Sequence, residues 1–190
     1  MPLEIEIKLK VPAHDPLRAA LQRVGGTYIR TVLETNTFFD RPDRSLRKAD
    51  TGLRVRTEIL EAGQPLARPA LLTFKGPRQA DALRSREAFD LSVSPAEQLI
   101  PLLQGLGFVQ MLSFEKRRES WELKDCLVEL DTMPEAGLFV EVEGPTEAAV
   151  SAVRSLLGLS ALLAVEQSYS AMMSQLAAAH PQWNQIVKLR

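Results

Sequence analysis

The chain has 190 residues, of which 45% are apolar and 25% are charged, proportions typical of one soluble globular domain. Its 23 basic and 24 acidic side chains nearly cancel, so the molecule as a whole has no net attraction to nucleic acid or to an acidic membrane. Any binding of anions must therefore depend on how charge is sorted locally.

The N-terminal residues and the single cysteine indicate the cellular setting. The chain is charged from Glu4 onwards, so we expect no signal peptide, and no apolar run is long enough to cross a bilayer. Cys126 is the only cysteine, which excludes an internal disulfide and a cysteine-based zinc site. We therefore expect a cytoplasmic protein in which Cys126 is a buried structural thiol.

The chain begins with a predicted strand that has two chemically opposite faces. Charged and apolar side chains alternate without a break over residues 4–11, and this period of two is typical of an extended strand. Alternation, or a high content of β-branched and aromatic residues, predicts further strands at 28–40, 53–59, 71–75, 85–93, 108–122, 126–132 and 138–143. The glycine and prolines of residues 61–69 indicate a hairpin loop.

Four helices are predicted between these strands and after them. The first has Asp15 as its N-cap and ends at Gly25 and Gly26. The second starts at a capping box formed by Ser94 and Glu97 and ends before Gly107. The other two span about 146–157 and 167–179.

About eight strands joined mostly by short turns favour antiparallel pairing, and this number is enough to close a barrel. The predicted fold class is therefore α+β, an eight-stranded antiparallel closed β-barrel with amphipathic helices packed outside. We expect one domain over residues 1–180, followed by a C-terminal tail at 181–190.

Charge on the predicted strands is sorted by sign. Acidic pairs alternate with apolar residues at Glu4/Glu6, Glu129/Asp131 and Glu141/Glu143, basic pairs do so at Arg54/Arg56 and Lys116/Arg118, and Lys8 and Lys75 are single bases. The simple interpretation is a solvated sheet face. The alternative is that the apolar faces pack against the helices and the charged faces line an interior that holds charged ligands.

Phosphate chemistry suits such an interior. Clustered carboxylates are hard oxygen ligands for Mg²⁺ or Mn²⁺. Arginine and lysine bind the non-bridging oxygens of phosphates, arginine in bidentate fashion. Together the two kinds of group provide the positioning and charge neutralisation that phosphoryl transfer requires.

An ordered set of motifs resembles the CYTH proteins, the triphosphate tunnel metalloenzymes. The N-terminal Glu4-x-Glu6-x-Lys8 is similar to their ExExK signature, and the match extends over about residues 1–170. The other motifs are TNTFFDRPD at 35–43, LRVR at 53–56, LTFKGP at 72–77, SREAFD at 85–90, EKRRESW at 115–121, VELD at 128–131 and FVEVEG at 139–144.

This resemblance implies an eight-stranded antiparallel tunnel that binds a triphosphate together with Mg²⁺ or Mn²⁺. The implied metal-site residues are Glu4, Glu6, Asp131, Glu141 and Glu143. The implied substrate-binding residues are Lys8, Arg54, Arg56, Lys75, Lys116 and Arg118, with Glu87 in the place of a tunnel glutamate. Of these sets, Lys8, Arg56 and Glu143 are expected to act in catalysis, and Glu129 remains without a role.

The leading functional prediction is hydrolysis of an inorganic, thiamine or nucleoside triphosphate. The first alternative is a class IV adenylyl cyclase, which converts ATP to cyclic AMP and pyrophosphate in the same kind of tunnel. An alternative of another class is a non-catalytic module that binds polyphosphate or nucleotide. The expected partner is a small-molecule triphosphate rather than nucleic acid or membrane, and a homodimer remains open.

Several other residues are expected to have structural roles. We expect His14 and His180 at the surface, because neither has a carboxylate or cysteine at ligand spacing. Packing is the expected role of Trp121, Phe38 and Phe39. Tyr169 resembles a family position near the C-terminal helix, and we expect no direct catalytic role for it.

Overall fold

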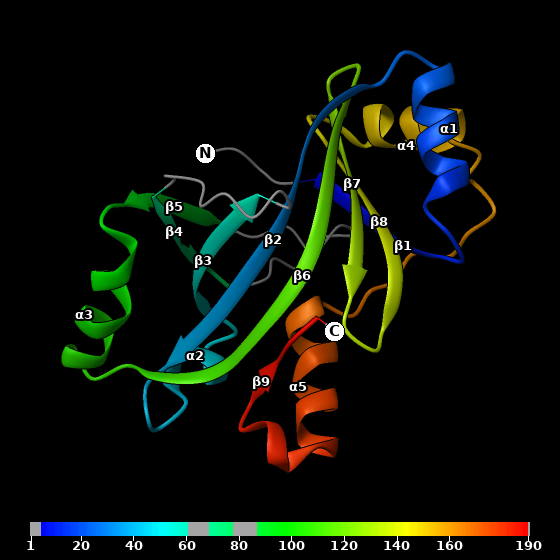
Figure 1. Ribbon diagram of the computed structural model, residues 1–190. Helices are drawn as coiled ribbons and strands as arrows, with labels where there is room; N and C mark the ends of the chain where they lie inside the picture. The colour runs from blue at the N-terminus through cyan, green and yellow to red at the C-terminus, as the bar shows by residue number, and fades with distance from the viewer. Residues whose placement is uncertain (1–4, 61–68, 78–86, 190) are drawn as a thin grey trace.

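The structure is a computed structural model that describes residues 5–60, 69–77 and 87–189. It is built on one antiparallel sheet with the strand order β1-β8-β7-β6-β2-β3-β4-β5 (Figure 1). The strands are β1 Ile5–Val11, β2 Thr27–Asp40, β3 Gly52–Leu60, β4 Ala70–Lys75, β5 Ala88–Val93, β6 Val109–Leu123, β7 Cys126–Met133 and β8 Gly137–Gly144. The eight predicted strands and their antiparallel pairing are confirmed; Glu4 and the loop 61–68 lie outside the described residues.

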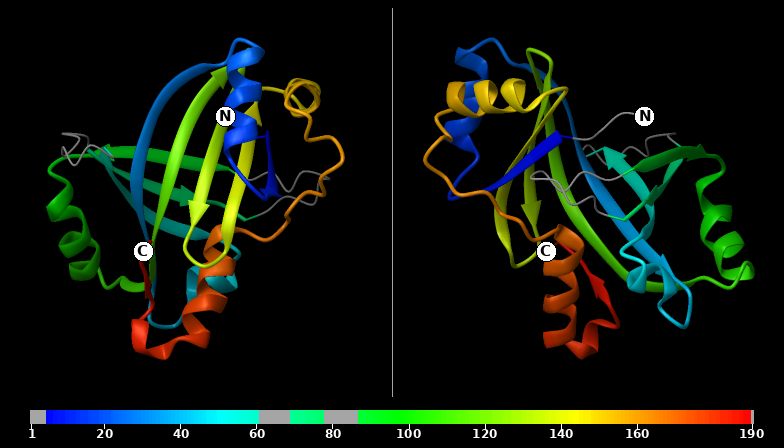
Figure 2. Two further views of the ribbon diagram at one scale, coloured as in Figure 1. Left: turned by 45° about the vertical axis from the view of Figure 1, so that its right-hand side comes forward. Right: turned by 180° about the vertical axis from the view of Figure 1, so that it is seen from behind.

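The sheet is strongly curved but does not close, which differs from the predicted barrel (Figure 2). Its path ends at β1 and β5, and within the described ranges these two strands are not paired. The outer edge of β1 is occupied instead by a segment that follows the last strand: Ala164 bridges Leu9, and the Val165 N–H donates to the Lys8 carbonyl at 2.8 Å. Because backbone groups of β1 are satisfied there, this edge is not free to accept β5.

Helices cover the convex side of the sheet, as expected. Helices α1 (Asp15–Arg23) and α4 (Glu147–Leu156) pack on β1, β8, β7 and the adjoining part of β6, while α3 (Leu99–Gly105) packs on the β2–β4 half (Figures 1 and 2). The first contact buries Leu9, Val128 and Val140 completely. Since successive strand residues point to opposite faces, this packing directs the charged positions to the concave side.

Two of the predicted helix starts are wrong. The N-cap of α1 is His14, and Asp15 is the first helical residue. The capping box at Ser94 does not form, because Pro95 is extended and a 3-10 turn, Ala96–Gln98, precedes α3.

Helices α4 and α5 (Tyr169–Ala179) are capped by side chains as their sequences suggest. The Thr146 and Ser168 hydroxyls accept hydrogen bonds from backbone N–H groups of the first turn, at 3.1 and 3.2 Å. These caps fix where each helix begins. Helix α5 therefore starts with Tyr169, directly after its cap.

The C-terminal segment packs at the lower end of the sheet. Helix α5 buries Met173 and Ala177 completely, among sheet residues that include Phe114 and Phe139. The chain then turns back through Pro181–Trp183, and β9 (Ile186–Val187) pairs in parallel with β6. The segment from 181 onwards is thus part of the packed structure in its described residues.

Across the described part of the chain, no helix combines the length and the apolar character needed to span a bilayer.

The short helix α2 (Ser45–Lys48) lies in the connection between β2 and β3.

Candidate functional site

Strand register brings the alternating charges of four strands onto the concave face. Lys8 of β1 lies opposite Glu141 of β8, and Glu141 lies opposite Glu129 of β7. One step along β7, Asp131 lies opposite Arg118 of β6. These five side chains are at most 9% exposed, so this part of the charged face is buried rather than solvated. The simple interpretation of a solvated sheet face is therefore wrong for these residues.

Arg118 is the centre of this buried cluster. Its Nε and Nη2 donate to the two oxygens of Asp131 at 2.7 and 2.5 Å, Nη2 also donates to Glu141 at 2.5 Å, and Nη1 pairs with Glu129. Burial alone would lower the pKa of Arg118, but the surrounding carboxylates, Asp131 first, raise it well above its usual range. The guanidinium therefore stays charged and holds three strands in one arrangement.

A second group of charges connects the cluster to β2 and β3. Lys116 donates to Asp131 at 3.0 Å and lies 3.5 Å from Glu34, which in turn pairs with Arg56 at 3.1 Å. Burial would raise the pKa of Glu34, but Lys116, Arg118 and Arg56 together lower it to about 2. Glu34 is thus an ionised carboxylate that is 1% exposed.

Sequence reasoning assigned no role to Glu34 or to its neighbour Asn36. The Asn36 side-chain oxygen accepts a hydrogen bond from Arg56 Nε at 2.9 Å, so both residues position the predicted phosphate-binding arginine. The signal was present in the sequence, because Glu34 and Asn36 alternate within a strand otherwise rich in apolar residues and threonine.

Arg54 differs from the other buried cations. Its Nη2 donates to Thr73 at 3.0 Å, while its Nε has no hydrogen-bond partner among the residues that the structure describes. Burial, together with the charge of Arg56, lowers the pKa of Arg54 to about 10, which still leaves it charged at neutral pH. The side chain of Arg54 is half-buried, but a buried N–H donor without a partner is costly unless an acceptor binds beside it.

Glu129 is another residue of the cluster to which sequence reasoning gave no role. It is 8% exposed and lies across from Glu141, so two carboxylates face each other between neighbouring strands. Burial raises the pKa of Glu129 to about 7, although Arg118 acts in the opposite direction. The residue therefore changes charge close to neutral pH.

Further carboxylates meet where β1 pairs with β8. Glu6 lies directly opposite Glu143. This pair is two residues along the strands from the pair formed by Lys8 and Glu141. Opposed like charges destabilise a sheet, and hard oxygen donors on adjacent strands suit a divalent cation of the Mg²⁺ type. Within the described ranges, however, no three acidic, histidine or cysteine side chains already form a metal-binding group. The donor chemistry fits such an ion, and binding it requires these side chains to converge further.

The remaining predicted residues lie at the edges of the cluster or outside the residues that the structure describes. Glu4 falls outside the described residues. Lys75 ends β4, half-buried and in register with Gly52 of β3. Glu87 is exposed just before β5, and its backbone carbonyl accepts from the Gly76 N–H at 2.8 Å.

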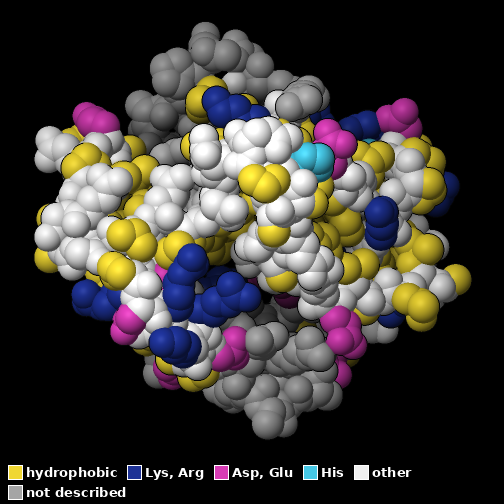
Figure 3. All heavy atoms as spheres, turned by 90° about the horizontal axis from the view of Figure 1, so that it is seen from below, with side chains coloured by type: hydrophobic (Ala, Val, Ile, Leu, Met, Phe, Trp, Pro, Cys, Tyr) yellow, Lys and Arg dark blue, Asp and Glu magenta, His cyan; other side chains and the backbone are white. Residues whose placement is uncertain are grey.

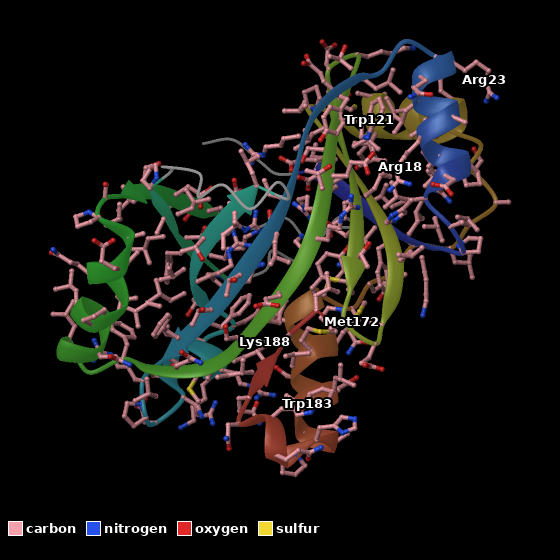
Figure 4. All side chains as sticks on the ribbon, in the orientation of Figure 1. Arg18, Arg23, Trp121, Met172, Trp183 and Lys188 are labelled. Carbon is pink, nitrogen blue, oxygen red and sulfur yellow. The ribbon has the colours of Figure 1, made fainter. Side chains whose placement is uncertain are left out.

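Not every charge on these strands faces the site. Glu119 points to the convex side, where its carboxylate accepts hydrogen bonds from Arg18 of α1 and from the Trp121 indole, and Figure 4 shows both partners at the α1 end of the sheet. His14 also lies on this side, and the prediction that it is a surface residue is wrong. It is 5% exposed, with Nε2 3.0 Å from the Phe139 carbonyl oxygen. Burial lowers the pKa of His14.

The structure confirms the packing roles predicted for several other side chains. Trp121, Phe39 and Cys126 are buried in the convex-side cores, and Phe38 packs beside Phe114 and the core around α5. His180 stacks on Trp183 after α5.

The lower face of the molecule has a basic surface. The segment around α2 carries the exposed residues Arg41, Arg44, Arg47 and Lys48. In the view from below, basic side chains gather on this face with acidic ones around them (Figure 3). A local positive potential of this kind increases the local concentration of anions even when the net charge is close to zero.

Comparison with known proteins places the chain in a family. The model of the CYTH domain matches residues 2–169. A protein of Methanocaldococcus jannaschii named "Putative adenylate cyclase MJ0240" is 26% identical over 141 residues, which are 74% of this chain and 76% of that protein.

Solved structures show the same fold at lower identity. The PH1819 protein from Pyrococcus horikoshii OT3 is 22% identical, with a TM-score of 0.74 over 91% of this chain and 99% of that one. A Hippeastrum protein described as "Putative adenylyl cyclase HpAC1" is 20% identical, with a TM-score of 0.70 over 93% of this chain and 96% of the other. The curved sheet, its buried charges and the match over residues 2–169 lead to one conclusion: the chain belongs to the CYTH family.

Proposed function

We propose that this protein hydrolyses a triphosphate, with Mg²⁺ or Mn²⁺, on the concave face of its sheet. The observation that carries the proposal is the unsatisfied guanidinium donor of Arg54. The side chain is half-buried with its Nε buried, it carries a positive charge near that of Arg56, and its only hydrogen bond in the described structure is to the neutral Thr73. A polyanion that lies against both arginines would satisfy these donors and offset the cost of burying them.

The two kinds of charged residue have different roles in this proposal. Arg54, Arg56 and Lys8 bind phosphate oxygens and hold the chain of phosphates in line. Lys75, Glu87, Lys116 and Arg118 complete the proposed substrate-binding set. Asp131 already binds Arg118 and Lys116 through both oxygens, so it also positions those cations.

The carboxylates of Glu6, Glu141 and Glu143 would hold the metal, with Glu4 and Asp131 as the remaining proposed ligands. A divalent ion supplies charge neutralisation and lowers the pKa of bound water. Glu143, Lys8 and Arg56 would orient an attacking water and the terminal phosphate, so that a bond from the water oxygen to the terminal phosphorus forms, the bond between the last two phosphates breaks and inorganic phosphate leaves.

A class IV adenylyl cyclase remains the second candidate. It would begin from the same bound triphosphate, but a ribose hydroxyl would attack the innermost phosphorus and pyrophosphate would leave. The name of the Methanocaldococcus jannaschii relative supports this candidate, whereas the description of the Hippeastrum protein states a dominant triphosphatase activity. The description of the Hippeastrum protein supports hydrolysis as the first choice.

Product analysis tests the proposal. The protein is incubated with tripolyphosphate, thiamine triphosphate or ATP, each with Mg²⁺ or Mn²⁺, while phosphate, pyrophosphate and cyclic AMP are measured. We expect phosphate release from at least one substrate. Cyclic AMP with pyrophosphate would identify a cyclase instead, and binding without turnover would identify a non-catalytic module.

A variant of Arg54 tests the observation itself. Arg54→Gln should weaken triphosphate binding but leave the free protein equally or more stable, because it removes a buried Nε–H donor that has no partner. The matched control is Arg23→Gln at the exposed end of α1, which should change neither property. Unchanged binding by Arg54→Gln would remove the support for this site.

A further inference from the structure

Tyr169 introduces the C-terminal helix into the buried charge cluster. It is the first residue of α5, 9% exposed, and its ring makes an edge contact with Phe139 of β8 at 5.5 Å between centroids. The Ser168 cap fixes where the helix begins, and the contact with Phe139 fixes the position of the ring. Helix α5 thereby contributes a side chain to a site that the sheet otherwise builds alone.

The ring of Tyr169 lies between two of the predicted phosphate-binding lysines. The ammonium groups of Lys8 and Lys116 lie 4.2 and 4.9 Å from its centroid. Contacts of this kind between a cation and an aromatic face are attractive, most of all when both groups are buried. The ring therefore attracts the ammonium group of Lys8 from β1 and that of Lys116 from β6.

The hydroxyl of Tyr169 is an unused donor at this point. It is buried and makes no hydrogen bond of standard geometry with the residues that the structure describes, although the Asp131 carboxylate is near enough to act on its proton. Burial, followed by the charges of Asp131 and Glu141 and by this contact with Asp131, raises the pKa of Tyr169 far above its usual range, so the phenol keeps its proton. A buried hydroxyl without a partner is rare in native proteins, and a binding site for an oxyanion explains it.

We propose that Tyr169 is a substrate-binding residue, whose hydroxyl donates a hydrogen bond to a phosphate oxygen held between Lys8 and Lys116. This inference rests on the proposed function, since it requires a triphosphate on the concave face. It adds a neutral donor to a set of cations and makes α5 part of the site. Tyr169 is proposed to bind the substrate, and no role in the chemical step is proposed for it.

The chain offers a matched test, because it has only one other tyrosine. Tyr28 lies near the start of β2 and is half-exposed, and its hydroxyl oxygen is 2.9 Å from that of Thr31, so it already has a hydrogen-bond partner. Tripolyphosphate is titrated by calorimetry, without metal and with Mg²⁺, into the wild type, Tyr169→Phe and Tyr28→Phe. Thermal unfolding of each free protein is recorded in parallel.

Tyr169→Phe should raise the dissociation constant about tenfold or more, the loss expected for one charge-assisted hydrogen bond. The free variant should be as stable as the wild type or more stable, because an unpaired buried hydroxyl has been removed. Tyr28→Phe should leave binding unchanged. A purely structural role for the hydroxyl predicts the reverse pattern, with reduced stability and unchanged affinity, and that result would overturn the inference.

A measurement on the wild-type sequence avoids any dependence on variant folding. With 3-fluorotyrosine incorporated, the protein has two ¹⁹F signals, which the Tyr28→Phe variant assigns. Tripolyphosphate should shift the Tyr169 signal and leave the Tyr28 signal in place. If the wild type binds tripolyphosphate without shifting the Tyr169 signal, this inference fails and the proposed function stands. If the wild type binds no triphosphate, both fail.

Discussion

Arg118 of β6 and Asp131 of β7 are register partners, and the guanidinium binds both carboxylate oxygens, at 2.7 and 2.5 Å. Both side chains are buried, and Asp131 is 0% exposed. Burial would raise the pKa of Asp131, but Arg118 and Lys116 lower it far below its usual range. This bidentate pair joins β6 to β7 at the centre of the buried cluster.

Asp131→Asn should destabilise the protein by about 1.5–3 kcal/mol, the usual cost of losing a hydrogen bond to a charged group, because Arg118 keeps Glu129 and Glu141 and Lys116 keeps Glu34. Arg118 and Lys116 would both lose an anion in this variant. The control is Asp125→Asn in the exposed turn between β6 and β7, which should have no measurable effect. Urea unfolding measures both, and equal stabilities would show that the charge of Asp131 contributes nothing measurable to the stability of the cluster.

Arg56→Ala should weaken triphosphate binding directly. Loss of one hydrogen bond to a charged group costs roughly 1.5–3 kcal/mol, or about 10- to 150-fold in affinity. Calorimetry without metal gives the binding constant, with Arg23→Ala as an exposed control. Because Arg56 also pairs with Glu34, a loss of stability is expected as well. Wild-type affinity in the variant would contradict the phosphate-binding role.

Glu143→Gln should nearly abolish turnover and weaken the use of metal. Metal-free triphosphate binding should stay the same or become tighter, because one negative charge has been removed from the site. In the wild type, EDTA should stop the reaction, and Mg²⁺ or Mn²⁺ should restore it. Turnover that persists in the chelator would refute a metal-dependent mechanism, and a variant that is fully active would remove Glu143 from it.

Glu129→Gln should change how stability depends on pH. Burial raises the pKa of Glu129 to about 7, whereas an unfolded glutamate titrates near about 4.3. The folded state therefore binds this proton more tightly, so the contribution of Glu129 to stability is present below about pH 4 and is lost as the pH rises through about 7.

The variant lacks this titration. Its stability relative to the wild type should therefore increase between pH 5 and pH 8, by an amount on the order of 2 kcal/mol. Urea unfolding at both pH values measures the difference. Glu122→Gln, an exposed position on β6, should show no such trend. A constant difference for Glu129→Gln across this range would mean that Glu129 stays ionised in the folded protein.

Local pattern was enough to predict the strands and the face on which each charge lies. Because successive strand residues point to opposite faces, the sequence alone places Lys8 and Leu9 on opposite faces of β1, and Leu130 and Asp131 on opposite faces of β7. Helix starts were predicted less well, because a cap depends on the backbone angles of a few residues, as Ser94 before the extended Pro95 shows. The same alternation could not predict that the edge of β1 is taken by Val165, since that contact joins distant segments.

What only the tertiary structure decided is which charges meet. Glu34 and Glu129 enter the cluster through the register of β2 with β6 and of β7 with β8, and Tyr169 enters through the docking of α5. His14 is buried because α1 packs its cap against β8. By itself the sequence determined the chemistry available to the site, because side-chain type and strand face are local properties. Pairing, burial and pKa depend on contacts between strands far apart in the chain, and these arise only when the sheet curves and the helices pack against it.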